Sequence, residues 1–414
     1  MASGEDRMRR FAAVAMAALL VAGAAEARTW RVRPGPDAEQ SLQTALIEAQ
    51  AGDTVQLDRG RFELSSGLSL DVDRVTIRGA GADRTVLSFA NQRRGAEGLL
   101  VTSDGVLLRD FAVENTRGDG IKVRDCTGIT FRNLRVEWTG GPNAGNGAYG
   151  LYPVNCSNVL IEGSTVRGAS DAGIYVGQSR NIIVRNNTAE FNVAGIEIEN
   201  SIGADVFGNT ATHNTGGILV FDLPGIPQVG GHSARVFQNT IIDNNTPNFA
   251  PAGNIVATVP TGTGVLIMAS RNVHVFDNEI GTHGSANVII AAYRAEFEDA
   301  NYNPLPRDVM IRNNRFGRSG FAPAGDFAAL AQAGVTLPDV VWDGATMFTP
   351  HGAMPRSENV RIVMRDNRAE SGGIGTFLSL GVQVAGAPVT EAAPDPTYPP
   401  LLAIEEPERI RIEN

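Results

Sequence analysis

Side chains that can transfer protons recur at one position of a repeated phrase. The phrase is close to Gly-Ile-x-Val, and the variable position carries Lys122, Tyr152, Tyr175 and Glu197 in successive copies. Lysine, tyrosine and glutamate can each act as a general acid or base when their surroundings adjust the pKa. Lys122 is also the only lysine in the chain. These four residues are therefore the candidate catalytic residues.

Candidate binding residues border the same strands. Arg124 and Glu199 stand two residues beyond the first and the last of the four, and so on the same face of their strands. Asp119, Asp171 and Asp222 adjoin the ends of these strands. The structural alternative is that outward charges are only solvated and that tyrosine or glutamate ladders stabilise a sheet.

A second phrase, an apolar residue followed by two others and Asn, predicts how these positions are arranged in space. Its shortest step, from Asn187 to Asn209, is 22 residues, and longer steps add a loop to that unit. Two or three short strands in each unit of about 22 residues indicate a solenoid whose turns stack on one another. Asn tolerates the left-handed backbone of a tight turn, and stacked Asn amides bond along a ladder. The ladder is predicted for Asn187, Asn209, Asn239, Asn278, Asn314 and Asn367.

The residues before the repeats predict how the solenoid begins. Residues Ser41 to Gln50 form an amphipathic pattern, and the helix it predicts would cover the first open sheet edge. After it come Gly52-Asp53-Thr54-Val55 and then Gly60-Arg61-Phe62. This order resembles the pectin-lyase-like superfamily of right-handed parallel β-helices, and the later repeats resemble exported parallel β-helix repeat proteins of unknown function. The expected fold is all-β.

The resemblance implies a substrate class and a chemistry. Many proteins of the superfamily modify acidic polysaccharides along one outer face, and we expect a polysaccharide partner here. For a lyase or epimerase reaction, Arg124 would offset the uronate carboxylate, and Lys122 or Tyr152 would remove the proton. Tyr175 would return a proton.

Hydrolysis is the alternative chemistry. Glu197 and Glu199 would lie roughly 6.6–7 Å apart along one strand face, near the lower limit of the carboxyl separation in inverting glycosidases. Asp119, Asp171 and Asp222 are the other carboxyl candidates. A third interpretation is a non-enzymatic periplasmic factor that binds a glycan, or that assists assembly or maturation together with a protein partner.

Metal chemistry has little support in the sequence. We find no copy of the Asp-Pro-His-Asp stretch of related mannuronan epimerases and no paired-Asp calcium cluster of the pectate lyase kind. No metal ligand is therefore predicted. Calcium stays open as a cofactor without a motif to indicate it.

The N-terminus and the composition predict location and partners. Residues 1–27 carry a basic start, an apolar run and Ala25-Glu26-Ala27, which is typical of a cleaved signal peptide. We expect a periplasmic or secreted protein with no membrane span in the mature chain. A net charge of −10 argues against nucleic acid as a partner. The β-helix should cover residues 28–384 with a helical insertion near 321–354, followed at 385–414 by a Pro/Ala-rich loop and a last strand.

The two cysteines should stack. Cys126 and Cys156 each stand three residues before an apolar residue at the same place in consecutive repeats, Ile129 and Val159. Stacked neighbours have the Cα spacing that a disulfide accepts. A buried, reduced pair is the alternative, because the directions of the Cβ atoms also decide the outcome.

Overall fold

A computed structural model describes residues 27–350, 354–381 and 395–412. The predicted signal peptide therefore lies, except for its last residue, outside the described residues. Among the described residues, no helix is long and apolar enough to cross a membrane.

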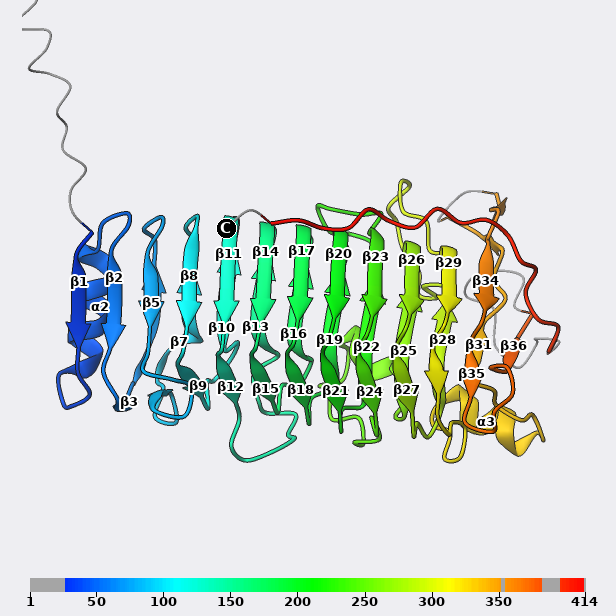
Figure 1. Ribbon diagram of the computed structural model, residues 1–414, viewed down its shortest axis with the longest axis horizontal. Helices are drawn as coiled ribbons and strands as arrows, with labels where there is room; N and C mark the ends of the chain where they lie inside the picture. The colour runs from blue at the N-terminus through cyan, green and yellow to red at the C-terminus, as the bar shows by residue number, and fades with distance from the viewer. Residues whose placement is uncertain (1–26, 351–353, 382–394, 413–414) are drawn as a thin grey trace, which may run out of the picture.

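The chain winds through three parallel sheets, here named A, B and C, in repeating order (Figure 1). Sheet A consists of β1 (Thr29–Val32), β2 (Thr54–Leu57), β5 (Thr76–Arg78), β8 (Val106–Arg109), β11 (Thr127–Arg132), β14 (Ser157–Glu162), β17 (Arg180–Arg185), β20 (Ile202–Phe207), β23 (His232–Phe237), β26 (Arg271–Phe276), β29 (Arg307–Arg312) and β34 (Ile362–Arg365). Sheet B consists of β3 (Gly60–Glu63), β6 (Thr85–Ser88), β9 (Ala112–Glu114), β12 (Arg135–Glu137), β15 (Thr165–Arg167), β18 (Thr188–Glu190), β21 (Thr210–Thr212), β24 (Thr240–Ile242), β27 (Glu279–Gly281), β30 (Arg315–Phe316) and β35 (Arg368–Ala369). Sheet C consists of β4 (Ser66–Leu70), β7 (Arg94–Val101), β10 (Ile121–Arg124), β13 (Tyr149–Val154), β16 (Ala172–Gly177), β19 (Ala194–Glu199), β22 (Gly216–Phe221), β25 (Thr263–Met268), β28 (Ala286–Ala291), β31 (Val340–Trp342) and β36 (Phe377–Ser379).

The register confirms the 22-residue unit and the parallel β-helix. Ile174 pairs with Ile196, which pairs with Ile218, so equivalent residues stack one turn apart. Their side chains point inward and are fully buried. Burying a side chain of this size contributes roughly 1.5–3 kcal/mol, and each turn adds several such side chains to one continuous core.

A helix closes the first turn, as predicted. Helix α2 (Ala38–Glu48) begins three residues before the predicted start and ends two before the predicted end. It buries Leu42 and Leu46 against the core. The Gln43 side chain accepts from the Ser69 N–H at 3.1 Å and donates to the Ser69 carbonyl at 3.0 Å. One side-chain amide thus satisfies both backbone groups at the edge of sheet C, in place of a neighbouring strand.

The predicted asparagine ladder is confirmed at the turn from sheet A to sheet B. The Asn187 amide donates to Asn209 Oδ1 at 3.0 Å, and the same bond repeats at every rung to Asn367. The left-handed backbone was expected at these positions and belongs instead to the residue before, such as Asn186 or Gln238. The side chains of the ladder residues point into the solenoid and are buried.

A second ladder, which the sequence analysis missed, lies at the turn from sheet B to sheet C. Asn192, Asn214 and Asn244 bond in succession at 3.0 and 2.9 Å. The ladder ends on His283, whose Nε2 lies 3.1 Å from the Asn244 amide. Burial lowers the pKa of His283 to about 4, so the ring is neutral and Nε2 accepts this bond.

The two cysteines stack as expected. The register pairs Ile129 with Val159, and the Cα atoms of Cys126 and Cys156 lie 4.5 Å apart. Their sulfur atoms are bonded, which links two consecutive turns at the corner between sheets C and A.

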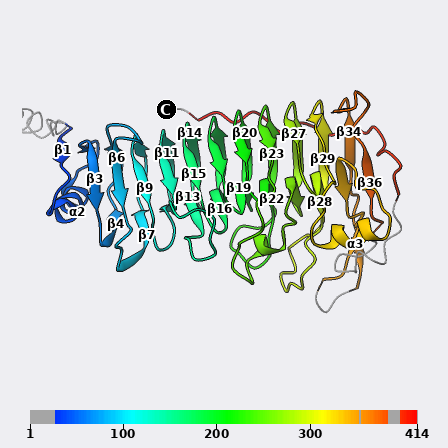
Figure 2. The ribbon, with the colours of Figure 1, turned by 90° about the horizontal axis from the view of Figure 1, so that it is seen from below.

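Loops cover the outer face of sheet C in its C-terminal half (Figure 2). They carry the 3₁₀ helix η1 (Ile255–Thr258) and helix α3 (Asp326–Gln332), which lies within the insertion expected near 321–354. A small hairpin of β32 (Met347–Phe348) and β33 (Arg356–Ser357) follows. A second apolar cluster fills the space beneath these loops and includes Leu219, Phe221, Leu266, Val256, Phe327 and Leu330.

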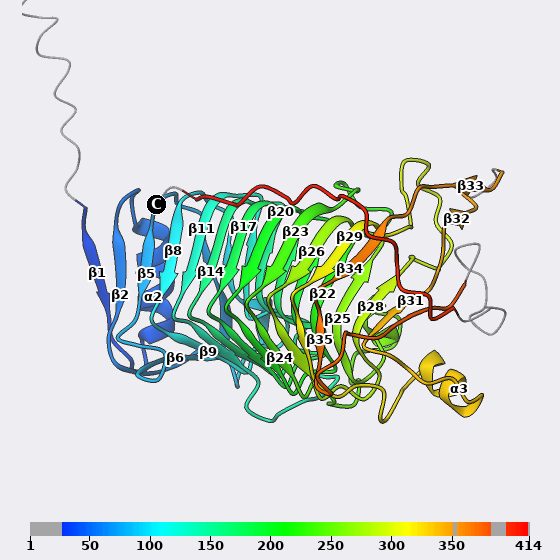
Figure 3. The same cartoon turned by 45° about the vertical axis from the view of Figure 1, so that its right-hand side comes forward.

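The residues after 395 cross the outer face of sheet A in place of the expected last strand (Figure 3). Residues 396–412, here called the C-terminal segment, contain no strand. Glu406 pairs with Arg235 at 3.3 Å and with Arg312 at 2.8 Å. The Ile410 N–H donates to Asp205 at 3.1 Å. The expected loop falls partly outside the described residues, at 385–394.

The asparagine ladder predicts a large loss of stability for a single buried amide. In Asn209→Ala, the Asn187 backbone N–H and the Val184 carbonyl lose their side-chain partner, and the Asn187 side-chain amide keeps only the Ile161 carbonyl. Each buried group left unpaired costs about 1–3 kcal/mol, so urea denaturation should show a loss of about 2–4 kcal/mol. Exposed Asn91→Ala serves as the control. Equal stability of the two variants would contradict a supporting role for the ladder.

Candidate functional site

The predicted column of catalytic candidates is one column in the structure. Lys122 pairs with Tyr152, and Tyr175 pairs with Glu197, on adjoining strands of sheet C. The sequence analysis placed the whole column on an exposed face, and this was wrong. Tyr175 and Glu197 are 4% and 1% exposed, and Tyr175 belongs to the buried cluster that includes Val256 of η1. An open groove across all four side chains is therefore excluded.

The N-terminal end of the column is partly exposed. Lys122 Nζ lies 3.8 Å from Glu97 Oε1 and 3.9 Å from Asp119 Oδ2. It also lies 4.8 Å from the centre of the Tyr152 ring. Arg124 does not join this group, since its guanidinium pairs with the neighbouring Asp125 at 3.2 Å. The amine of Lys122 is thus the cation that faces the tyrosines.

Three tyrosine rings form the middle of the site. The centres of the Tyr149, Tyr152 and Tyr175 rings lie between 4.4 and 5.0 Å apart. Tyr149 was not predicted as a site residue, although it follows a Gly- and Asn-rich stretch as the first residue of β13. Burial raises the pKa of Tyr152 to about 12. Its hydroxyl is therefore a poor base at neutral pH, although the ring remains suited to contact a sugar.

Glu197 and Glu199 form a buried pair of interacting carboxyl groups. Tyr175 donates its hydroxyl to Glu199 Oε1 at 2.7 Å. Burial, and then the charges of Asp171 and Glu199, raise the pKa of Glu197 far above its ordinary value. Glu197 thus carries the proton, and its Oε2 has no hydrogen-bond partner.

Asp171 lies beside this pair under the loop before η1. Its Oδ2 is 3.1 Å from the Asn254 amide and 3.5 Å from the Tyr149 hydroxyl. Burial, and then the charge of Glu199, raise the pKa of Asp171 to about 7. Asn254 was missed because it lies in a loop outside the repeat, 83 residues further along the chain.

Asp119 lies at the partly exposed end. Its Oδ1 accepts the Tyr149 N–H at 3.3 Å, and its side chain is 15% exposed. Burial raises the pKa of Asp119 to about 6, against the opposing effect of Lys122. Asp119 therefore exchanges its proton near neutral pH while remaining accessible from outside, as a general acid requires.

Asp222 holds a loop in place through hydrogen bonds to the loop's backbone. Its two carboxylate oxygens accept the N–H groups of Gly230 and Gly231 at 3.0 and 2.6 Å, which closes the loop before β23. Burial raises its pKa to about 6. Its oxygens are used by the loop, and we remove it from the binding candidates.

The remaining residues, here called the acid–tyrosine cluster, share one stretch of sheet C. They are Asp119, Lys122, Tyr149, Tyr152, Asp171, Tyr175, Glu197 and Glu199. Within the residues that the structure describes, no three or more His, Cys, Asp or Glu side chains are grouped as metal ligands. The raised pKa values of Asp119 and Asp171 suit these carboxyl groups to proton transfer.

The proton on Glu197 predicts a pH-dependent gain of stability in Glu197→Gln. The unfolded chain ionises Glu197 as the pH rises above about 4.5, whereas the folded chain keeps it protonated, so rising pH destabilises the wild type at this residue. Gln cannot ionise in either state. The two proteins should match near about pH 4.5, and the variant should gain up to about 1.4 kcal/mol for each further pH unit.

Thermal and urea denaturation across this range measure the difference. Buried His274 and His283, whose pKa values are lowered to about 4, also make the free energy of unfolding depend on pH, in the opposite direction. Their contribution is the same in both proteins, so it cancels when the wild-type value is subtracted from that of the variant. Exposed Glu48→Gln is the matched control and should give a difference that does not vary with pH. If the difference in free energy of unfolding between Glu197→Gln and the wild type also did not vary with pH, Glu197 would be ionised in the folded chain.

Comparison with known proteins places the fold. A solved structure of DFA-IIIase from Arthrobacter chlorophenolicus, without its lid, aligns with 88% of this chain and 97% of its own at 12% identity and a TM-score of 0.54. The A-module of a mannuronan C-5 epimerase from Azotobacter vinelandii covers 85% and 96% at 16% identity and a TM-score of 0.49. A family 28 exopolygalacturonase from Yersinia enterocolitica covers 86% and 78% at 12% identity and 0.46. At these identities the likeness concerns the fold alone.

No curated protein matches the chain significantly. The family model described as "Right handed beta helix region" matches residues 66–229 and 144–316. These two matches together extend over more than half of the chain, and the structure shows three stacked parallel sheets over the same residues. The chain therefore belongs to the right-handed β-helix family.

Proposed function

We propose that this protein binds a polysaccharide on the outer face of sheet C, between β7 and β19, and modifies it by proton transfer. The observation that carries the proposal is Asp119. It is a carboxyl group with a pKa of about 6, partly accessible, and placed beside a lysine and a group of tyrosine rings. Asp119 would protonate the bridging oxygen of the sugar chain as the general acid.

The neighbouring side chains suit a sugar polymer. Tyr149 and Tyr152 are partly buried and combine ring faces with hydroxyl groups, a surface that packs on sugar rings and bonds their hydroxyls. Lys122 would hold a uronate carboxylate. Protonation of Asp119 removes one of the two acids that face Lys122, so an acidic sugar would bind better below about pH 6.

Among the reactions considered, hydrolysis has the better physical support. The raised pKa of Tyr152 weakens elimination and epimerisation, because Lys122 would have to act as the base while it also holds the uronate carboxylate. Asp119 and Asp171 instead offer two carboxyl groups with pKa values near neutrality. Two turns separate them, roughly 9.5 Å along the axis, close to the separation in inverting glycosidases. The loop that carries Asn254 would open to expose Asp171.

Non-enzymatic binding is the second candidate. The burial of Tyr175, Glu197 and Glu199 favours it, because buried side chains do not reach a substrate bound on the outer face. Such a protein would bind a glycan, or act with a protein partner in assembly or maturation. The basic and apolar pattern of residues 1–27 supports export of the chain in either case.

Variants at Asp119 and Tyr152 separate these functions. We expect Asp119→Asn to lower turnover of a polyuronate or neutral glycan by about 10²–10⁴-fold. Tyr152→Phe should keep most of the activity, and Tyr152→Ala should weaken binding. Exposed Asp83→Asn is the control for the Asp119 substitution.

Three readouts on one substrate panel identify the reaction. New reducing ends would show hydrolysis, ultraviolet absorbance of unsaturated ends would show elimination, and altered uronate NMR signals would show epimerisation. Elimination that is lost in Tyr152→Phe would overturn the assignment to Asp119. Binding without any of the three products would support the non-enzymatic function.

A further inference from the structure

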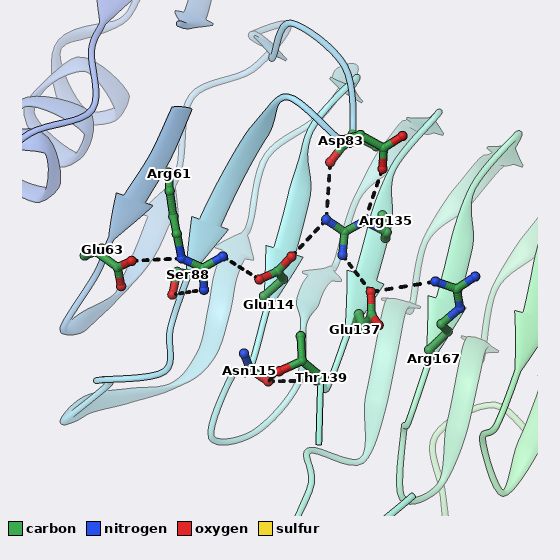
Figure 4. A network of polar contacts seen from close by, with 11 residues as sticks. Arg61, Glu63, Asp83, Ser88, Glu114, Asn115, Arg135, Glu137, Thr139 and Arg167 are labelled. Carbon is green, nitrogen blue, oxygen red and sulfur yellow. Dashed lines mark hydrogen bonds and ion pairs between the residues drawn. The ribbon is translucent and has the colours of Figure 1, made fainter. Parts of the chain in front are cut away.

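The outer face of sheet B carries a ladder of paired charges in its N-terminal half (Figure 4). Glu114 receives Arg61 at 2.7 Å and Arg135 at 2.8 Å, and Arg135 also reaches Glu137 at 2.6 Å. Arg167 continues the ladder to Glu190 at 2.6 Å. Each guanidinium on this half of the face thus has a carboxylate partner one rung away or on its own strand.

Among the described residues, two arginines in the C-terminal half of the same face lack a carboxylate partner. The register places Arg315 directly opposite Arg368 on β35 and, on its other side, opposite Glu279 on β27. Both side chains are exposed, and within the described part of the chain neither forms a hydrogen bond, ion pair or ring contact. Like charges directly opposite in a sheet destabilise it. The fold therefore holds two unpaired cations one rung apart, roughly 4.8 Å.

A cleft of about 1480 Å³ lies over these arginines. Gly281 and Gly317 line it and stand where earlier rungs carry Glu190, Thr212 and Ile242. A Cβ on Gly281 would come within 2.7 Å of Gly317, so the two backbones approach each other closely at this point.

The lining of the cleft combines charge with apolar surface. Arg318 also lines it and packs on the ring of Phe321 at 4.3 Å, while Ile374 is 70% exposed at its edge. Three acids, Glu279, Asp366 and Glu370, border the cleft as well. Among the ion pairs of the described residues, none joins these acids to the arginines.

We propose that this cleft binds a carboxylate-bearing glycan chain, with Arg315 and Arg368 each holding one carboxylate. Two cations repeated along the solenoid axis fit a polymer with repeated anionic groups, and the planar guanidinium matches a carboxylate with two hydrogen bonds. The exposed apolar side chains suit the faces of sugar rings. The site lies on a different sheet from the acid–tyrosine cluster and does not depend on the function proposed for it.

Calorimetric titration of the full chain with oligogalacturonate, and with its methyl ester as the uncharged counterpart, tests the site. We expect binding of the acid and not of the ester. The double variant Arg315→Gln/Arg368→Gln should bind the acid at least tenfold more weakly. Its thermal stability should be equal to or higher than that of the wild type, since the two like charges are removed. Arg167→Gln on the same face, where the guanidinium is already paired, should bind as the wild type does.

Other results would overturn the inference. These are no binding of oligogalacturonate by the wild type, equal binding by the double variant, or equal binding of the ester. Arginine-dependent binding of phosphatidylglycerol vesicles without binding of oligogalacturonate would assign the cleft to lipid. Loss of binding in Tyr152→Ala, with the arginine variant unaffected, would place the acidic sugar on sheet C. That result would support the function proposed for sheet C and contradict the binding site proposed on sheet B.

Discussion

The stacking of each turn on the equivalent residues of the turn before it is the constraint from which the other features follow. Backbone hydrogen bonds set this register, and the buried amides of Asn187 and its equivalents maintain it at each turn between sheets A and B. A turn that slipped by one residue would exchange inward and outward side chains and would break the amide ladder at once. The fold therefore specifies not only which residues are buried but which residue lies above which.

This constraint decides the electrostatics of each face. On sheet B, Arg167 stacks on Glu137 and Glu190, and Arg135 in the adjacent column bridges Glu114 and Glu137, so neighbouring rungs form ion pairs. On sheet C, the acids of β19 lie beside Tyr175 and near Asp171 without a cation among them, and burial then favours their protonated forms. The same stacking thus gives ion pairs on sheet B and protonated carboxyl groups on sheet C. The difference comes from the order of residue types along each column and from the loops that cover it.

The parts of the structure that repeat could be predicted from the sequence. The phrase around Ile174 and Ile196 indicated the column of sheet C, and the phrase around Asn187 indicated the ladder, because a repeated spacing fixes a repeated position. Non-repeating contacts could not be predicted in this way. Asn254 reaches Asp171 from a loop 83 residues away, and no local pattern reports the path of such a loop. The exposure of Glu197 was misjudged for the same reason, since strand alternation gives the direction of a side chain and not what packs over it.

The C-terminal segment changes how the solenoid behaves as a whole. In a linear stack each turn contacts only its neighbours, so the two ends can unfold independently and in steps. Glu406 and Ile410 connect the last described residues to strands β20, β23 and β29, and so bypass the turns between them. These contacts add interactions between turns that are not neighbours, which a linear stack lacks. The C-terminal segment therefore contributes to the stability of turns that precede it by up to 205 residues in the sequence.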